Sequence, residues 1–474
     1  MAVCFLGALT VFGFAPFHLF PLPLFSLALL FALWRRAATP RVAAGLGFFW
    51  GLGFFLAGVS WIYVSMHDFG GMPAPIAALA TVLFCAYLAL YPAFAGWMFA
   101  RFRSGVGWRD ALLAAAVWTL AEWLRGWIFT GFPWLGLGYS QAPASPLAGF
   151  AAVFGVYGVG FIAALLAALI LSWRRYWAVI IAFLLCGQIM QSIAWTAPVG
   201  APLTVSLLQG NISQSLKWEP ERLPQSLETY ARLSREHPAQ LTVLPETALP
   251  LFYDEVPPDY MRQLAAKGAV LTGVAMRSGA TDSDYSNAAV AVTAAGEKPQ
   301  VYAKSHLVPF GEFLPKGFSW FLALMNIPMS DFSPGPERQE ALVLAGQRVM
   351  PNICYEDLFG EEIIRALPAA TLLVNLSDTA WFGHSLAQPQ HLQIAQLRSL
   401  ETGRFMLRAT NTGMTAVVRP DGVVAAVLPA FTEAALTAEV RGYAGMTPYA
   451  RWGNALIVLI ALLSLLPALL RRRS

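Results

Sequence analysis

Glu246, Lys304 and Cys354 each follow a short apolar run, and together they could catalyse acyl transfer. A cysteine attacks an ester or amide carbonyl after losing its proton, which the carboxylate of Glu246 could accept and pass to the leaving group. The ammonium of Lys304 could stabilise the oxyanion that develops. Cys354 stands at an expected strand-to-helix turn, where N–H groups of the helix start are expected to lower the pKa of its thiol.

Each of the three groups is weak evidence by itself. A charged group at a strand end is usually only solvated, and a lone cysteine in an apolar strand is more often a small buried hydrophobe than a nucleophile. No histidine is expected to end a strand, because His306 lies in the Lys304 segment and His384 and His391 flank a later helix. The catalytic interpretation depends on the three groups occurring together.

A layered α/β domain over 199–445 would position these groups. Helical stretches are expected near 221–237, 358–367 and 386–403. Apolar runs rich in strand-forming residues recur at 202–208, 241–244, 269–275, 287–294, 348–353, 370–374, 405–409 and 414–418. Helices interleaved with short buried strands favour a layered α/β fold, in which polar groups gather where strands end.

The rest of the chain has the composition of a membrane protein. Of the 474 residues, 57% are hydrophobic and 12% are charged, which excludes an ordinary soluble protein. A hydrocarbon core needs roughly 20 apolar residues per helix. Such runs predict eight spans, at about 2–16, 19–34, 43–64, 75–100, 109–129, 148–173, 177–195 and 453–470.

The arginines predict the orientation of these spans. Clusters of arginine follow the second, fourth, sixth and eighth spans, and basic residues in short loops stay on the cytoplasmic side. We therefore expect a seven-helix transmembrane bundle at 1–198, an external catalytic domain at 199–445, and a C-terminal transmembrane helix with a cytoplasmic arginine tail at 446–474. Both termini would be cytoplasmic, and in a bacterium the catalytic domain would be periplasmic.

Several partners are not expected. The arginines form no basic face and belong to no recognition motif, so nucleic acid is not expected as a partner. Cys4, Cys85 and Cys186 lie in apolar runs, which leaves neither a disulfide framework nor a paired-cysteine metal site. Within the fifth span, Glu122 and Arg125 are expected to form an ion pair, with a lipid-headgroup contact as the alternative.

Longer motifs around the three groups resemble the nitrilase superfamily. They read Leu-Pro-Glu246-Thr, Lys304-Ser-His-Leu-Val-Pro-Phe-Gly-Glu312-Phe and Ile-Cys354-Tyr-Glu356. With the expected spans, the whole chain is similar to the apolipoprotein N-acyltransferases of bacterial inner membranes. Further segments that resemble this family are Phe14-Ala-Pro-Phe17, Gly131-Phe-Pro-Trp134, 209–218 and 407–413.

The resemblance implies a polytopic α-helical membrane protein with a nitrilase-like αββα sandwich, and a two-step reaction without a cofactor or metal. In the first step Cys354 would take an acyl chain from a phospholipid, typically the sn-1 chain of phosphatidylethanolamine, to give a thioester. In the second, the α-amino group of the N-terminal S-diacylglyceryl cysteine of an apolipoprotein would attack that thioester. The enzyme is expected to be a monomer in the bacterial inner membrane.

The resemblance also implies residue roles. Glu246 would be the base, Lys304 the oxyanion-stabilising cation and Cys354 the nucleophile. Supporting residues would be Glu312 and Glu356, which orient Lys304 or the amine, and Tyr355, which shapes the thioester site. Substrate-binding residues would be Trp218, Gly131, Trp134 and Asn287.

Two further segments, 377–383 and 313–329, lie near the expected catalytic residues in the sequence. Where the family commonly has Ser-Asn-Asp-Ala-Trp-Phe-Gly, this chain has Asp378 and Thr379 at the second and third positions, so what the family pair contributes is open here. The apolar stretch 313–329 is interrupted by proline and glycine, which favours a membrane-dipping arm or lid beside the site over a buried core segment.

Two other functions compete with lipoprotein acylation. One is a membrane-tethered amidase or nitrilase that acts on a small soluble amide, and a requirement for a phospholipid acyl donor would distinguish it. The other is a transporter or scaffold with an inactive outer domain. The spans hold few ionisable groups for a transport path, which disfavours this last hypothesis.

Overall fold

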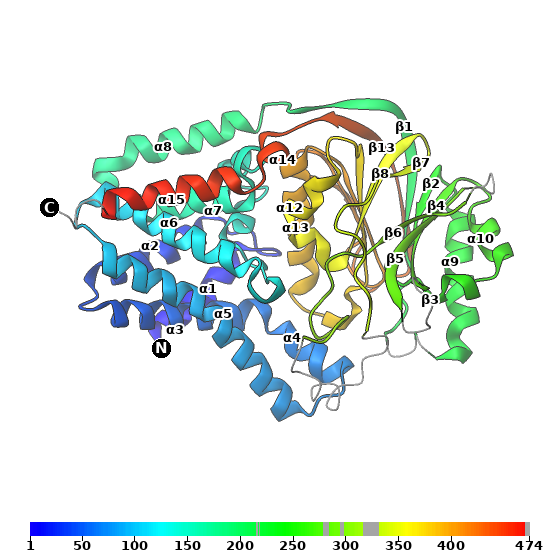
Figure 1. Ribbon diagram of the computed structural model, residues 1–474, viewed down its shortest axis with the longest axis horizontal. Coiled ribbons are helices and arrows are strands. Elements are labelled where there is room, and N and C mark those ends of the chain that lie inside the picture. Colours follow the sequence, from blue (N-terminus) through cyan, green and yellow to red (C-terminus); the bar gives the residue numbers. More distant parts are fainter. Residues whose placement is uncertain (215–216, 218, 278–283, 294–297, 316–330, 470–474) are drawn as a thin grey trace. The chain divides into compact units, whose positions relative to one another are not determined.

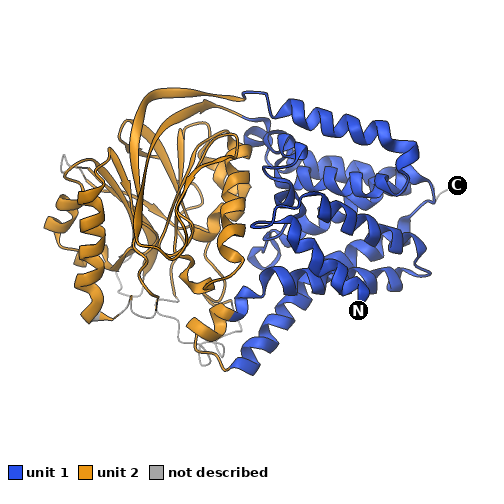
Figure 2. Ribbon diagram, turned by 180° about the vertical axis from the view of Figure 1, so that it is seen from behind, with its two compact units in different colours: residues 1–63, 74–194, 447–474 blue, residues 64–73, 195–446 orange. Residues whose placement is uncertain are grey.

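The computed structural model describes the chain except residues 215–216, 218, 278–283, 294–297, 316–330 and 470–474 (Figure 1). The described chain forms two compact units, one of residues 1–63, 74–194 and 447–474, the other of residues 64–73 and 195–446 (Figure 2). We call them the helical unit and the sandwich unit. Trp218 and most of the expected arm at 313–329 lie outside the described residues.

The helical unit consists of helices built from the apolar runs. They are α1 (Ala2–Thr10), α2 (Pro21–Arg36), α3 (Pro40–Val59), α4 (Trp61–Val64), α5 (Ala74–Phe102), α6 (Gly107–Arg125), α7 (Ala151–Ile170), α8 (Trp173–Met190), α14 (Pro448–Trp452) and α15 (Ala455–Leu469). The side chain of Thr39 caps α3 by accepting from the backbone N–H of Val42, and a proline begins both α2 and α3. Each expected span therefore contains a helix.

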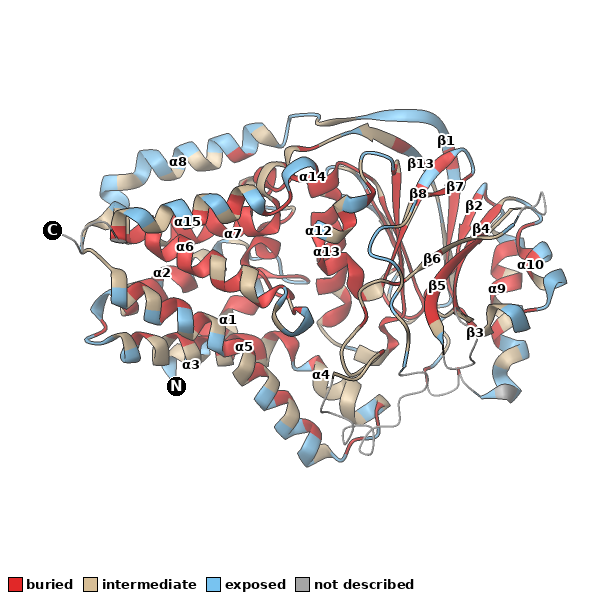
Figure 3. Ribbon diagram, in the orientation of Figure 1, coloured by how far each residue is buried: buried red, intermediate tan, exposed pale blue. Residues whose placement is uncertain are grey.

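Among the residues that the structure describes, three helical segments are long and apolar enough to cross a membrane: Pro40–Val59, Ala74–Phe102 and Pro146–Ile170. Ala2–Gly13 and Ala455–Ala468 are shorter apolar helices. Along α8, large apolar side chains such as Trp177, Leu185 and Ile189 are more than half exposed (Figure 3). Such a surface suits contact with lipid, while the full set of eight spans stays a prediction.

Glu122 and Arg125 on α6 both bind the loop that follows the helix. Arg125 Nη1 donates to the carbonyl oxygens of Phe132 at 2.6 Å and Trp134 at 2.7 Å, and Glu122 Oε1 accepts from the N–H of Leu137 at 2.9 Å. Among the described ion pairs the direct contact expected from their spacing does not occur, so that expectation was wrong. Both charged groups satisfy loop backbone that helical hydrogen bonding cannot reach.

The sandwich unit contains two β-sheets. The first has the order β13-β1-β2-β4-β5-β6, with β3 paired to β4. Its strands are β1 (Thr196–Gln209), β2 (Leu241–Val243), β3 (Leu249–Phe252), β4 (Ala269–Arg277), β5 (Tyr285–Val292), β6 (Gln300–Ala303) and β13 (Ala434–Gly445). The second has the order β12-β11-β10-β9-β8-β7, with β7 (Leu342–Leu344), β8 (Gln347–Ile353), β9 (Leu372–Ser377), β10 (Met406–Thr410), β11 (Ala416–Val418) and β12 (Val424–Val427).

Helices cover the outer face of each sheet. The helices α9 (Leu223–Glu236) and α10 (Pro258–Leu264) lie on the first sheet, and α12 (Gly360–Ile363) and α13 (Ala387–Thr402) lie on the second (Figure 1). The central strands are buried on both faces: Leu372 and Val374 of β9 pack between the sheets, whereas Leu373 packs toward α13. The expected αββα sandwich is therefore confirmed.

The topology brings the ends of separate strands to one edge of each sheet. Strands β8, β9 and β10 are parallel neighbours, so Cys354 after β8, Asp378 after β9 and Asn411 after β10 follow adjacent strand ends. In the first sheet Glu246 comes shortly after β2, and Lys304 directly follows β6. The site is assembled from these ends.

Candidate active site

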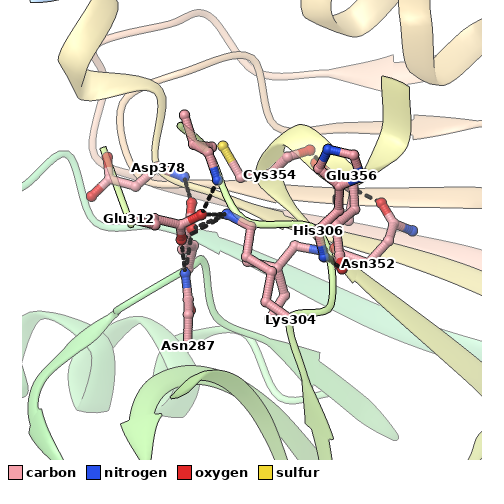
Figure 4. A network of polar contacts seen from close by, with 12 residues as sticks. Asn287, Lys304, His306, Glu312, Asn352, Cys354, Glu356 and Asp378 are labelled. Carbon is pink, nitrogen blue, oxygen red and sulfur yellow. Dashed lines mark hydrogen bonds and ion pairs between the residues drawn. The ribbon is translucent and has the colours of Figure 1, made fainter. Parts of the chain in front are cut away.

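Glu246 is buried, with 7% of its surface exposed, and both of its carboxylate oxygens have partners. Oε1 accepts from Asn287 Nδ2 at 2.8 Å and lies 3.3 Å from Lys304 Nζ. Oε2 accepts from the backbone N–H of Asp378 at 2.8 Å. The backbone of Glu246 packs directly against Gly273. A Cβ at position 273 would lie 2.5 Å from the Cα of Glu246, so a side chain there would clash. The carboxylate is therefore held from both sheets, by Asn287 and Lys304 of the first and by Asp378 of the second, all three labelled in Figure 4.

Lys304 lies between two carboxylates. Its Nζ is 2.8 Å from each oxygen of Glu312 and 3.3 Å from Glu246 Oε1, and the residue is 1% exposed. Burial by itself lowers the pKa of Lys304, but the carboxylates of Glu312 and Glu246 outweigh it, and the net effect raises the pKa. Lys304 is therefore a fixed cation at neutral pH.

Asn287 on β5 joins the two carboxylates. Its Nδ2 donates to Glu246 Oε1 and to Glu312 Oε1, each at 2.8 Å, and its carbonyl oxygen accepts from the backbone N–H of Lys304. Glu312 Oε2 also accepts from the N–H of Val308 at 2.8 Å. Of the expected supporting and substrate-binding residues, Glu312 thus contacts Lys304 directly, and Asn287 contacts both Glu246 and Lys304.

Cys354 stands where β8 ends and a 3₁₀ turn, Cys354–Leu358, begins. Its φ of 52° lies in the left-handed region, which is strained for a residue with a side chain. Asn375 Nδ2 donates to its carbonyl oxygen at 3.2 Å and helps to hold this turn. A strained turn held by its surroundings is typical of a functional position.

The surroundings of Cys354 raise the pKa of its thiol. Removal from water and, after it, the negative charge of Glu246 raise its pKa, and the positive charge of Lys304 does not offset them. The expectation of a lowered pKa at the helix start was wrong, because removal from water outweighs the few N–H groups of a short turn. The cysteine needs a base at the moment of attack.

Glu356 fastens the Cys354 turn to the Lys304 segment. Its Oε1 accepts from the N–H groups of Ser305 at 2.7 Å and His306 at 3.1 Å, and its Oε2 accepts from the N–H of Ile353 at 2.7 Å and the hydroxyl of Tyr302 at 2.9 Å. Burial raises the pKa of Glu356 in spite of these donors. Glu356 therefore joins the backbone next to Lys304 to the backbone next to Cys354.

Tyr355 contacts aromatic neighbours beside the turn. Its ring packs edge-on against Phe359 at 5.2 Å between centroids, and His306 stacks on the same Phe359 at 3.7 Å. Gly131 and Trp134 belong to the helical unit, where Gly131 has a φ of 87° and Trp134, 1% exposed, packs on Trp61. Trp218 lies outside the described residues, so its expected role in substrate binding stays a prediction.

Two groups of buried charges beside Glu246 and Cys354 were not expected from the sequence. One is the ion pair of Lys217 with Asp378, at 2.5 Å beside Glu246. The other lies behind Cys354, where Asp357 accepts from His391 Nε2 at 2.8 Å and from Arg408 Nη1 at 3.2 Å. The departure from the family motif at Asp378 could have indicated the Lys217–Asp378 ion pair, because a carboxylate that becomes buried needs a cation nearby.

The arrangement brings a thiol near a buried carboxylate and a buried ammonium that contact each other, the groups expected as nucleophile, base and cation. Glu246 and Lys304 both act electrostatically on the thiol of Cys354, and an ammonium in this place is a donor of the kind that an oxyanion requires. In the described part of the chain, no cluster of histidine, cysteine or acidic side chains is arranged to hold a metal ion. The network suits acyl transfer through a thioester.

Comparisons with known proteins agree with this geometry. Residues 6–169 match the apolipoprotein N-acyltransferase N-terminal domain, and residues 204–449 match the carbon-nitrogen hydrolase family. An amidase from Nesterenkonia sp. is a distant structural neighbour, with 18% identity, a TM-score of 0.40 and coverage of 55% of this chain and 97% of that chain.

Relatives named "Apolipoprotein N-acyltransferase" match almost the whole chain. The protein from Nitrosomonas europaea is 52% identical, covering 97% of this chain and 95% of its own length. The protein from Ralstonia nicotianae is 48% identical, covering 99% and 92%. Identity at this level over both units shows that the chain belongs to the apolipoprotein N-acyltransferase family.

Proposed function

We propose that this protein is an N-acyltransferase that moves an acyl chain from a phospholipid to the α-amino group of the N-terminal S-diacylglyceryl cysteine of apolipoproteins. The observation that carries the proposal is the set of buried Glu246, buried Lys304 and partly buried Cys354 in a chain whose relatives at 52% and 48% identity bear this name. The exposed apolar side chains of the helical unit favour a lipid donor.

In the first step Glu246 accepts the proton of Cys354 as the sulfur attacks the ester carbonyl of the donor. The carbonyl oxygen becomes an oxyanion beside the ammonium of Lys304. When the intermediate collapses, the ester C–O bond breaks and Glu246 returns the proton to the alcohol oxygen of the lysophospholipid. The acyl chain remains on Cys354 as a thioester.

In the second step the α-amino group of the acceptor attacks the thioester carbonyl. Glu246 takes a proton from the attacking nitrogen, Lys304 stabilises the second oxyanion, and the C–S bond breaks. The proton passes to the departing sulfur, which restores the thiol of Cys354. The products are an amide on the lipoprotein and the free enzyme, so no cofactor is consumed.

The supporting residues act through the groups they hold. Glu312 holds the ammonium of Lys304, Asn287 holds the backbone of Lys304 and the carboxylates of Glu246 and Glu312, and Glu356 holds the turn of Cys354. Tyr355 shapes the thioester side of the site. Gly131, Trp134 and Trp218 are assigned to substrate entry on their motifs alone.

The arginine pattern gives the proposed topology. Eight spans place both termini in the cytoplasm and residues 199–445 in the periplasm of a bacterial inner membrane. The proposed donor is the sn-1 chain of phosphatidylethanolamine, and the proposed state is a monomer. A cysteine at the exposed Glu340 position tests the orientation: a membrane-impermeant maleimide should label it from outside intact spheroplasts, and protection until lysis would reverse the topology.

Mass spectrometry of a reconstituted reaction tests the function. Purified protein in detergent is incubated with phosphatidylethanolamine and a diacylglyceryl lipopeptide, and both lipids are followed. We expect a lysophospholipid, an acyl adduct on residue 354 and a triacylated lipopeptide, all lost in Cys354→Ala. If wild type produces no triacylated lipopeptide but hydrolyses a small soluble amide without phospholipid, the protein is the membrane-tethered amidase instead.

A further inference from the structure

A second buried ion pair lies next to the proposed base. Lys217 Nζ is 2.5 Å from Asp378 Oδ2, and the two residues are 4% and 5% exposed. Asp378 donates its backbone N–H to Glu246 Oε2 at 2.8 Å, and Lys217 Nζ lies 3.5 Å from the carbonyl oxygen of Glu246. Both members of the pair therefore contact Glu246, Asp378 at its carboxylate and Lys217 at its backbone carbonyl.

Asn411 holds the same corner of the site. Its Nδ2 lies 3.3 Å and 3.4 Å from the two carboxylate oxygens of Asp378, and its Oδ1 accepts from the N–H of Ile212 at 2.9 Å. Asp378 Oδ1 also accepts from the N–H of Ala380. The segment before Lys217 is thus fastened to the strand ends that carry Asp378 and Asn411.

We infer that Lys217 and Asp378 are positioning residues for Glu246, and that the charge balance of their ion pair sets the pH range in which Glu246 accepts a proton from Cys354. This inference rests on the proposed function of the site. A buried ion pair gains little stability over an apolar pair, whereas removal of one partner leaves an uncompensated charge. Here that charge would stand against the reacting carboxylate.

The direction of each effect follows from the sign of the charge that is left. Lys217→Met leaves the Asp378 carboxylate beside Glu246, which favours the protonated carboxyl. Asp378→Asn keeps the backbone N–H bond to Glu246 but leaves the Lys217 ammonium unpaired, which favours the carboxylate. The other charged or titratable groups that act on this corner are Lys304, Glu312, Cys354, Arg408 and Tyr230, and both variants leave them in place.

Single-turnover acylation tests the inference. The rate of the acyl adduct on Cys354 is measured by mass spectrometry at saturating phosphatidylethanolamine between pH 5 and 9. We expect the acid limb to move up by about one unit in Lys217→Met and down by about one unit in Asp378→Asn, as an unpaired neighbouring charge does. In the double variant the two shifts should cancel, and Lys267→Met, at an exposed lysine, should match wild type.

The outcomes separate this inference from the proposed function. If wild type forms no adduct, the proposed function fails. If wild type forms the adduct and Asp378→Asn is slower with an acid limb that coincides with wild type, the pair is merely structural and the inference is wrong. Thermal unfolding identifies a variant that does not fold; Asp378→Asn is nearly isosteric and carries the family residue, so it decides the question even if Lys217→Met is lost.

Discussion

Glu312→Gln separates two possible roles of this carboxylate. Glu312 contacts the ammonium of Lys304 at 2.8 Å through both oxygens, accepts from Asn287, and is 9% exposed. Glutamine preserves the volume and one acceptor but removes the charge opposite Lys304. Hydrogen bonds to charged groups contribute about 1.5–3 kcal/mol, so acylation of Cys354 should slow by roughly 10- to 150-fold if that energy is needed to hold Lys304.

The two half-reactions are measured separately. Adduct formation is followed in single turnover with phosphatidylethanolamine alone, and the preformed adduct is then mixed with the diacylglyceryl lipopeptide. We expect both steps to slow, because Lys304 stabilises an oxyanion in each. Glu340→Gln, at an exposed position after the site, is the matched control and should behave as wild type.

The result that refutes this reasoning is specific. If Glu312→Gln acylates Cys354 at the wild-type rate and only the second step slows, Glu312 handles the incoming amine and does not position Lys304. If neither step changes while the protein remains folded, the contacts of Glu312 are irrelevant to the reaction.

Three further predictions concern burial. Arg408→Met leaves Asp357 buried without its cation, so the free energy of unfolding should fall by about 3–5 kcal/mol, measured by chemical denaturation; a loss below about 1 kcal/mol would contradict a structural ion pair. In Glu246→Gln, iodoacetamide should modify Cys354 slowly at pH 7 and faster as the pH rises above 9, because burial raises the pKa of the thiol; a rate already constant from pH 6 would exclude that. Tyr302→Phe removes one donor to Glu356 and should lower thermal stability while acylation changes less than about threefold, since the backbone N–H bonds remain; a large loss of rate would place Tyr302 in the chemistry.

The fold was largely readable from the sequence, because its elements are determined locally. Apolar runs predicted the helices α1 to α8 and α15, and runs of β-branched and apolar residues predicted strands such as β4, β8 and β9. The strand β13 (Ala434–Gly445) was missed, because it pairs along the edge of the first sheet with many side chains partly exposed, and so lacks the buried strands' apolar run.

The identity of Glu246, Lys304 and Cys354 as a set was likewise determined by the sequence, since each follows an apolar strand and lies in a family motif. What only the tertiary structure decided is how their charges balance. Removal from water raises the pKa of the thiol against the local expectation from its turn, and Lys217, distant in sequence, lies against Asp378. Electrostatic energy depends on the distance between charges in space and on the exclusion of water. Both are determined by the tertiary structure and cannot be obtained from local sequence patterns.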